Sequence, residues 1–137
     1  MDADYALIEA VPSVVEHGRL RVIAGMSAKR AEAAALGLPN SWYAVVVRHG
    51  GEAVGMGRVI GDGGLFFQVV DIAVDPAHQG RGLGKAIMAA IAGKLRRDAP
   101  KSAYVSLIAD GEAHRLYAQY GFALTAPASV GMAMTMA

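Results

Sequence analysis

The chain has 137 residues, of which 54% are apolar and 18% are charged, so it can fill a hydrophobic core and is not intrinsically disordered. Its 13 basic and 12 acidic residues leave a net charge of +1, which provides no strong field to attract nucleic acid or an acidic membrane. The absence of cysteine excludes disulfides, a thiol nucleophile and thiolate metal ligands. We expect a single domain over residues 1–137.

The N-terminal residues and the hydropathy pattern indicate in which cellular compartment the protein is expected. Met1–Asp4 carries acidic residues where a signal peptide needs basic ones, and no apolar run approaches the length of about 20 residues that a membrane span requires. We therefore expect a cytoplasmic protein that binds neither membrane nor nucleic acid.

The first half of the chain combines strand and helix patterns. Alternating apolar residues and runs of strand formers mark the strands, Pro12-Ser13 marks the start of one helix, and Ser27 is a suitable N-cap for the next. In chain order we expect a strand over 5–10, helices over 12–25 and 27–36, and strands over 42–48, 52–60 and 65–74.

The second half begins with a change of period. Apolar residues at 83, 87, 90, 91 and 95 have the spacing of one helix face, which predicts a helix over 83–97. A strand over 104–108, a helix over 111–120 and strands over 122–125 and 130–136 follow. The order predicts an α/β fold with a mixed sheet.

A glycine-rich loop joins the strand 65–74 to the helix 83–97. Backbone amides and the positive end of the helix dipole make such a junction suitable for binding a phosphate. The loop is not the phosphate-binding loop of nucleotide triphosphatases, because Gln79 and Ala86 stand where that motif needs Gly and Ser or Thr. Nor is it the dinucleotide fingerprint, because Lys85 replaces the third glycine.

The loop does contain the pattern Gln-x-x-Gly-x-Gly at 79–84, after Val74-Asp75-Pro76. This pattern resembles the signature of the GNAT-type acetyl-CoA-dependent N-acetyltransferases. The resemblance implies that coenzyme A is bound by its pyrophosphate on the loop and by its pantetheine arm on the preceding strand. The implied loop residues are Gln79, Gly80, Arg81, Gly82, Leu83, Gly84 and Lys85, and the implied strand residues are Ile72, Ala73 and Val74.

The segment 110–122 resembles a second part of the same family pattern, Asn-x-x-Ala-x-x-Leu-Tyr-x-x-x-Gly-Phe. Asp110 stands where the family usually has Asn, at a position that contacts the cofactor. The resemblance makes Tyr117 the general acid that protonates the leaving thiolate. A phenol with a pKa near 10 is protonated at neutral pH and suits that role.

The acceptor amine must lose a proton before it attacks, which costs about 4–5 kcal/mol at pH 7 for an alkylamine. Family members often carry a base on the fourth strand, but the matching position here is Gln68, which cannot titrate. Asp71 is the nearest carboxylate, and strand alternation puts it on the opposite face from Gln68 unless a bulge intervenes. It could bind the amine, support a water molecule or serve the structure.

The resemblance also implies an acceptor site between the first helices and the middle strands. Together with Asp71, Phe67 and Arg30 are our candidates for substrate contacts there. Phe67 could equally be a core residue and Arg30 part of a solvated helix face. No pair of histidines or carboxylates has metal-ligand spacing, so we expect no metal site.

Together these features predict a GNAT fold, with a mostly antiparallel sheet of six to seven strands and about four helices. The expected reaction moves an acetyl group from acetyl-CoA to a primary amine, by direct attack in a ternary complex. A small-molecule amine is the favoured acceptor. The alternatives are a protein lysine or N-terminal acetyltransferase and a non-catalytic acyl-CoA-binding module. The apolar segment 130–136 could extend the sheet, across a homodimer if the chain pairs with a copy.

Overall fold

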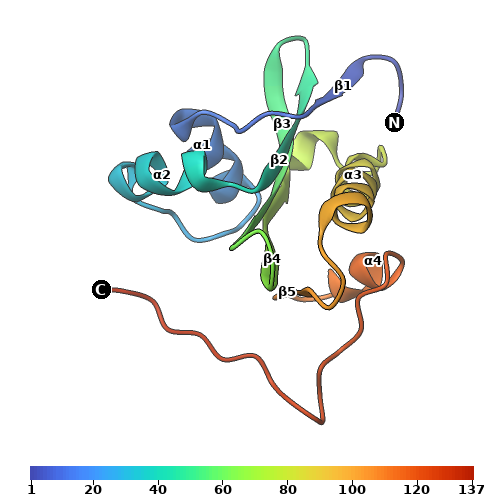
Figure 1. The fold of residues 1–137 in the computed structure, drawn as a ribbon. Coiled ribbons are helices and arrows are strands. Elements are labelled where there is room, and N and C mark those ends of the chain that lie inside the picture. Colours follow the sequence, from blue (N-terminus) through green and yellow to red (C-terminus); the bar gives the residue numbers. More distant parts are fainter.

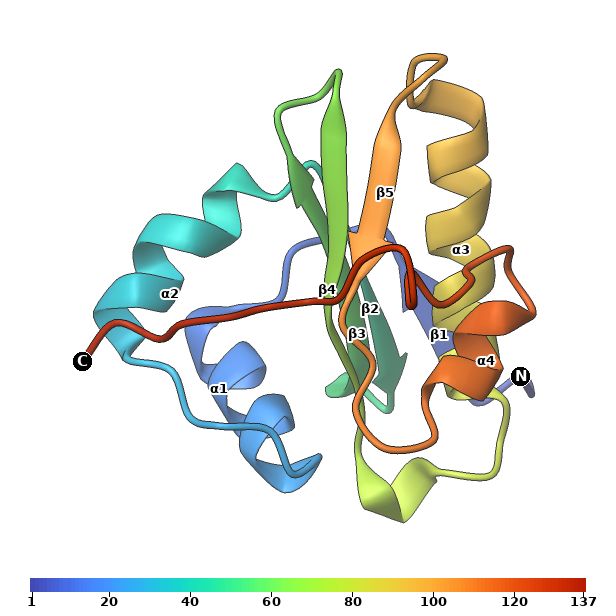
Figure 2. The same cartoon turned by 90° about the horizontal axis from the view of Figure 1, so that it is seen from below.

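A computed structural model describes all residues 1–137 and shows one sheet with helices on both faces (Figure 1; Figure 2). No helix in it is long and apolar enough to cross a membrane. In chain order the elements are β1 (Tyr5–Ile8), α1 (Val14–Ile23), α2 (Ala31–Gly37), a 3₁₀ turn (Leu38–Asn40), β2 (Tyr43–His49), β3 (Glu52–Gly61), β4 (Phe66–Val74), a 3₁₀ turn (Pro76–His78), α3 (Leu83–Asp98), β5 (Tyr104–Leu107) and α4 (His114–Ala118).

The five strands lie in the order β1-β2-β3-β4-β5. Neighbours from β1 to β4 are antiparallel, whereas β5 runs parallel to β4. A parallel pair needs a crossover, and α3 provides it by packing on β2, β3 and β4. The expected mixed, mostly antiparallel sheet and four α-helices are confirmed, with fewer strands than expected.

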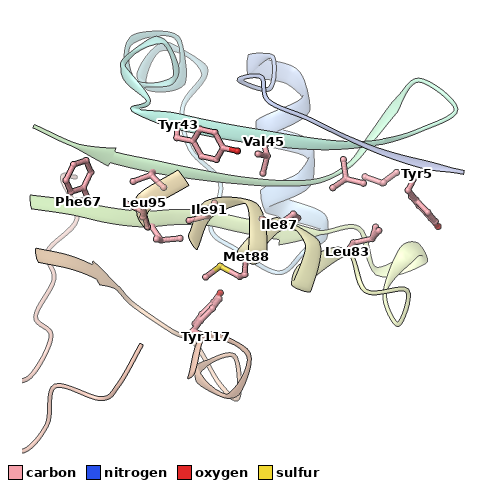
Figure 3. Close-up of a cluster of buried hydrophobic side chains, with 14 residues drawn as sticks. Tyr5, Tyr43, Val45, Phe67, Leu83, Ile87, Met88, Ile91, Leu95 and Tyr117 are labelled. Atoms are coloured by element: carbon pink, nitrogen blue, oxygen red, sulfur yellow. The ribbon is translucent and has the colours of Figure 1, made fainter. Parts of the chain in front are cut away.

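The core has two parts, one on each face of the sheet. The larger cluster lies between the sheet and α3 and includes Phe67, Ile87 and Ile91 (Figure 3). The smaller cluster lies on the α1 face, around Leu20. On the α3 side the contact is close at Gly57, where a Cβ atom would lie 2.6 Å from Ile87 Cγ2. Glycine at this position lets α3 sit directly on β3.

The two N-terminal helices begin in different ways. Ser13 and Glu16 form a capping box at the start of α1, close to the helix start predicted at Pro12-Ser13. Our expectation that Ser27 caps the second helix is wrong, because α2 begins only at Ala31. Arg21 holds Ser27 instead, donating from Nε to its carbonyl (2.9 Å) and from Nη2 to its hydroxyl (3.2 Å).

A bulge in β4 changes the direction of its side chains. Met56 pairs with Ala73 and Arg58 with Val70, so β4 has one more residue than β3 in this stretch. Asp71 lies in the bulge and has φ of 58°, a left-handed conformation that Asp tolerates better than most residues. Before the bulge Val69 faces the α3 cluster, and after it Ala73 faces the α1 cluster. Asp71 therefore shares the α1 face with Gln68.

The two C-terminal strands that we expected, over 122–125 and 130–136, do not form, because strand residues need a neighbouring strand for their backbone hydrogen bonds. After α4 the chain makes a turn in which the Ser129 amide donates to the Thr125 carbonyl (3.0 Å). It then runs away from the domain as an extended tail (Figure 1). The tail meets no strand, and Val130 and Met132 are 70% and 90% exposed.

Candidate active site

The site begins where β4 and β5 separate. Their parallel pairing ends at Val69 opposite Leu107, although β4 continues to Val74. The bulge at Asp71 bends β4 just beyond this point. The strands therefore leave an opening in the sheet, and two cavities meet there.

The first cavity, which we name the gap cavity, lies between the free part of β4 and the segment that leads from β5 to α4. It has a volume of about 370 Å³. Its walls bring together many of the residues expected to bind the cofactor, together with the expected acid: Ile72, Ala73, Val74, Gln79, Gly84, Asp110 and Tyr117.

The second cavity, which we name the basic cavity, lies on the other face of the sheet between α1, α2, β3 and β4. It has a volume of about 460 Å³ and is lined by Arg21, Lys29 and Arg58 among others. The two cavities share a wall made of Met26, Val69, Val70, Asp71, Ile108 and Asp110. The two cavities therefore adjoin at the point where β4 and β5 separate.

The glycine loop at the end of the gap cavity presents unused hydrogen-bond donors. The amides of residues 80–85 donate to no acceptor within the chain. Gly80 and Gly82 have φ of 78° and 79°, which glycine adopts without strain, and the 16-residue helix α3 begins directly afterwards. Arg81 and Lys85 are exposed and form no ion pair. The loop can thus bind a diphosphate through its amides, the helix dipole and two cations.

Two hydrogen bonds fix the ends of this loop. The hydroxyl of Tyr5 lies 2.7 Å from Nδ1 of His78 and ties the loop to β1. The hydroxyl of Tyr120, just after α4, donates to the carbonyl of Lys85 (3.0 Å) and links this segment to the first turn of α3. His78 thus has a structural partner, and Tyr120 has a positioning role that the sequence did not indicate.

Tyr117 projects from α4 into the larger core cluster, on the side of Met88 (Figure 3). The residue is 8% exposed, its hydroxyl makes no hydrogen bond within the chain, and its side chain is among those that line the gap cavity. Burial and the nearby charge of Asp110 raise the pKa of the phenol above 10. The hydroxyl is therefore protonated at neutral pH and available as a donor.

Asp71 is the centre of a buried ionic cluster. Arg21 donates to its Oδ1 (2.6 Å), while Nε of Arg58 and Nε2 of His17 donate to its Oδ2 (2.8 and 2.9 Å). Burial raises the pKa of this carboxyl, but the hydrogen bonds from Arg58, His17 and Arg21 outweigh burial and hold it below its ordinary value. With both oxygens occupied by donors, two of which are arginines, Asp71 holds these arginines in place and is not a free base.

The sequence did not point to the arginines and the histidine of this cluster. Arg21 and His17 lie 50 and 54 residues from Asp71, so only the packing of α1 against β4 brings them together. For Lys29 the sequence left two readings, a solvated helix face shared with Arg30 or a contact with an acidic group of the substrate, and only Lys29 of the two lines the basic cavity. Arg21 lies next to the buried Leu20 on α1, and a charged residue beside a core position was the only signal in the sequence that pointed to this cluster.

Two expected substrate contacts lie elsewhere. Phe67 is 2% exposed and packs against Trp42 on the α3 face, because it precedes the bulge and points away from the basic cavity. Arg30 points into solvent with its side chain 86% exposed and pairs with Glu32 (3.4 Å). Neither residue lines either cavity. The structure contains no group of three His, Cys, Asp or Glu residues arranged to hold a metal.

Comparisons with known proteins agree with this architecture. The sequence profile of the acetyltransferase (GNAT) domain matches residues 40–124. The structure of a probable acetyltransferase of unknown function from meticillin-resistant Staphylococcus aureus is 43% identical, has a TM-score of 0.92, and is covered over 99% of its length by 96% of this chain. No protein in a set with curated functions matches.

More distant structures share the fold alone. A GNAT-family acetyltransferase from Streptococcus pneumoniae has a TM-score of 0.77 at 20% identity, over 97% of this chain and 98% of that one. Glucosamine-6-phosphate N-acetyltransferase from Arabidopsis thaliana has a TM-score of 0.70 at 13% identity, over 97% of this chain and 99% of that one.

Proposed function

The chain belongs to the GNAT family of acetyltransferases, and we propose that it transfers the acetyl group of acetyl-CoA to the primary amine of a small molecule. The observation that carries the proposal is the meeting of two cavities at the opening between β4 and β5. One cavity ends at an anion-binding loop and contains a buried phenol, and the other is lined by charged groups suited to a polar acceptor. Both substrates can then be bound together, as direct transfer requires.

Acetyl-CoA fits the gap cavity by the chemistry of its walls. The free amides of residues 80–85, with Arg81 and Lys85, would hold the pyrophosphate. The backbone of Ile72–Val74 extends past the last residue paired with β5 and is available to the amide groups of the pantetheine arm. Acetyl-CoA supplies an activated acyl group as a thioester; the protein supplies its orientation and a proton donor.

Tyr117 is the proton donor in this proposal. The departing thiolate needs a proton, and a phenol whose pKa is raised by burial and by Asp110 keeps its proton at neutral pH. Asp110 lies in the shared wall of the two cavities, where its carboxylate can attract the ammonium group of the acceptor. The ammonium releases one proton to solvent before the neutral amine attacks, and the second proton, lost as the amide forms, restores the phenol that protonated the thiolate. Asp71 acts indirectly, by orienting Arg21 and Arg58.

The charges of the basic cavity favour an amine that also carries an acidic group. Asp71 neutralises only one of its two arginine partners, and Lys29 adds a further cation that forms no ion pair. Nη2 of Arg58 makes no hydrogen bond in the chain. A carboxylate or phosphate on the substrate would be attracted by these groups while its amine lies near Asp110.

The test is thiol release from acetyl-CoA, measured with a panel of amines in matched pairs with and without a carboxylate or phosphate, and with lysine peptides. We expect release to depend on a small amine, with the acidic member of each pair giving the higher kcat/KM. Mass spectrometry of the product should find the acetyl group on nitrogen. Release with peptides alone would favour the protein acetyltransferase alternative. Binding of acetyl-CoA by calorimetry without release for any acceptor would favour the binding module.

A further inference from the structure

The segment 24–30, which connects α1 to α2, forms part of the wall of both cavities. It lies with these helices on the face of the sheet opposite α3 (Figure 2). Ala24, Gly25 and Met26 line the gap cavity, and Met26 and Lys29 line the basic cavity. Met26 is thus the one residue of the segment in the wall that the cavities share. It borders the place where an acceptor amine would meet a bound thioester.

Arg21 holds the chain on both sides of Met26. The Arg21 carbonyl accepts from the Met26 amide (2.8 Å), and the guanidinium donates to Ser27, from Nε to its carbonyl (2.9 Å) and from Nη2 to its hydroxyl (3.2 Å). Nη1 of the same group donates to Oδ1 of Asp71 in the β4 bulge (2.6 Å). No other side chain links the segment 24–30 to the sheet by a hydrogen bond or ion pair.

The chemistry of this bridge requires an arginine. Arg21 is 8% exposed, and a guanidinium buried to this extent is stable only when its donors are paired. All three of its nitrogens donate within the chain, whereas Nη2 of Arg58 is free for a substrate. A lysine would keep the charge beside Asp71, but its single ammonium lacks the planar fork that reaches Asp71 and Ser27 together.

We infer that Arg21 is a positioning residue, which fixes Met26 at the junction of the two cavities and thereby aligns the acceptor amine with the thioester. The inference rests on the proposed function, because such alignment matters only for direct transfer between two bound substrates. In this role Arg21 acts through the segment 24–30 and takes no part in the proton transfers.

Steady-state kinetics of Arg21→Lys test the alignment. We expect kcat to fall at least roughly tenfold for acidic and neutral amines alike, because a shift of about 1 Å between the reacting atoms is sufficient for such a loss. The affinity for acetyl-CoA, measured by calorimetry, should change little, because the glycine loop holds the diphosphate. A higher KM for acidic amines alone, with kcat unchanged, would make Arg21 a substrate-binding residue and overturn the inference.

The matched control is Arg48→Lys. Arg48 also anchors α1 to the sheet, by donating to Glu16 (2.8 Å), but it lines neither cavity. We expect this variant to keep the wild-type kcat. An equal loss of kcat in both variants would show that any loosening of α1 is sufficient and would contradict a specific role of Arg21.

A double-mutant cycle tests whether Arg21 acts through Met26. Met26→Ala removes the side chain at the junction, so we expect this variant also to lose kcat. In its background, Arg21→Lys should lower kcat hardly any further, because the two changes disturb the same contact. Losses that multiply in the double variant would mean that Arg21 acts by another route.

Hydrogen exchange measured by mass spectrometry does not depend on activity. The amides of Ala24, Gly25 and Met26 donate to carbonyls of α1, and we expect them to exchange faster in Arg21→Lys than in the wild type or Arg48→Lys. Unchanged exchange would overturn the inference, as would faster exchange with an unchanged kcat. A wild-type chain that acetylates no amine would instead defeat the proposed function, and with it the alignment.

Ser27→Ala provides a milder variant if Arg21→Lys does not fold. Ser27 is exposed, and the change removes only the hydrogen bond from Nη2 of Arg21. We expect kcat and the protection of the segment from exchange to fall together, by smaller factors than in Arg21→Lys. A loss of protection with full kcat would again contradict the inference.

Discussion

At the scale of single residues, Tyr117 combines a buried ring with a hydroxyl that has no partner in the chain. We expect Tyr117→Phe to lower kcat at least roughly tenfold with little change in the affinity for acetyl-CoA, because only the proton donor is lost. Since the pKa of Tyr117 is raised, its protonation should not limit the wild-type rate below about pH 10. Steady-state kinetics between pH 6 and pH 10 measure both effects, with Tyr104→Phe as the control; an unchanged kcat would remove Tyr117 from the mechanism.

Lys29 and Arg30 are adjacent cations with different surroundings. Lys29 lines the basic cavity, whereas Arg30 points into solvent. We expect Lys29→Gln to raise the KM of acidic amines about five-fold and to leave the KM of their neutral counterparts unchanged, because a partly solvated charge pair contributes about 1 kcal/mol. Arg30→Gln is the matched control and should alter neither. Equal effects of the two variants would count against an anion site in this cavity.

Asp71 shows how one carboxylate can hold a site together. Asp71→Asn keeps a residue that tolerates the positive φ but removes the charge that faces Arg21 and Arg58. We expect a loss of roughly 3 kcal/mol in the free energy of unfolding at pH 7, because two buried cations lose their counter-ion. Asp98→Asn, at an exposed pair with Lys94, should leave the free energy of unfolding almost unchanged, because solvent screens such a pair.

The pH dependence of this loss has a definite sign. The folded-state pKa of Asp71 is lowered, so its charge stabilises the fold above the ordinary Asp pKa of 3.8, and this contribution is lost as the pH falls through the lowered value. The stability difference between wild type and Asp71→Asn should therefore shrink as the pH falls below about 4. Urea unfolding at pH 7, 5 and 3 measures it, and a difference that does not change with pH would contradict the assignment.

At the scale of elements, the junction of β4, the glycine loop and α3 couples backbone conformation to ligand binding. Gly82 ends the loop with φ of 79°, and a Cβ atom there would meet only the Met1 nitrogen at 3.8 Å. The fold therefore has room for alanine, at a backbone cost of about 1 kcal/mol. The added methyl group would lie on the surface of the loop where its amides are proposed to bind the diphosphate, so it would obstruct the ligand and not the fold.

We accordingly expect Gly82→Ala to weaken acetyl-CoA binding at least roughly tenfold, by loss of close approach to the loop amides. Gly63→Ala is the control, because Gly63 has φ of 81° and open space in a turn outside both cavities. Calorimetry gives the affinities and thermal unfolding gives the stabilities. Both variants should lose a similar amount of stability, and a similar loss of affinity in both would show that strain alone is responsible.

At the scale of the whole molecule, pairing of two copies through the apolar segment 130–136, which the sequence pattern allows, would make stability depend on protein concentration, because dissociation precedes or accompanies unfolding. The apparent Tm of the full chain should rise by several degrees between low and high micromolar concentration. The Met132→Lys, Met134→Lys variant should show a constant Tm. Scanning calorimetry over a concentration series measures this, and a constant Tm for the wild type would argue against the dimer.

Local patterns were sufficient for much of the fold and part of the site. The period of α3, the glycine loop and the segment around Tyr117 are each contained in a few consecutive residues, so the sequence by itself determined the family and the expected mixed α/β architecture. Two positions could not be read in this way. Phe67 was left either as a substrate contact or as a core residue, and the structure places it in the core. Strand alternation put Asp71 on the opposite face from Gln68 unless a bulge intervened, and a bulge is present.

Only the tertiary structure decided which distant groups meet. His17, Arg21 and Arg58 converge on Asp71 because α1 packs on the face to which the β4 bulge turns that carboxylate, and no local period records such a contact. The segment Val130–Met136 has a strand pattern, yet it forms no strand in the isolated chain. Side-chain alternation is a property of the segment itself, whereas a strand also needs the hydrogen bonds of a neighbouring edge.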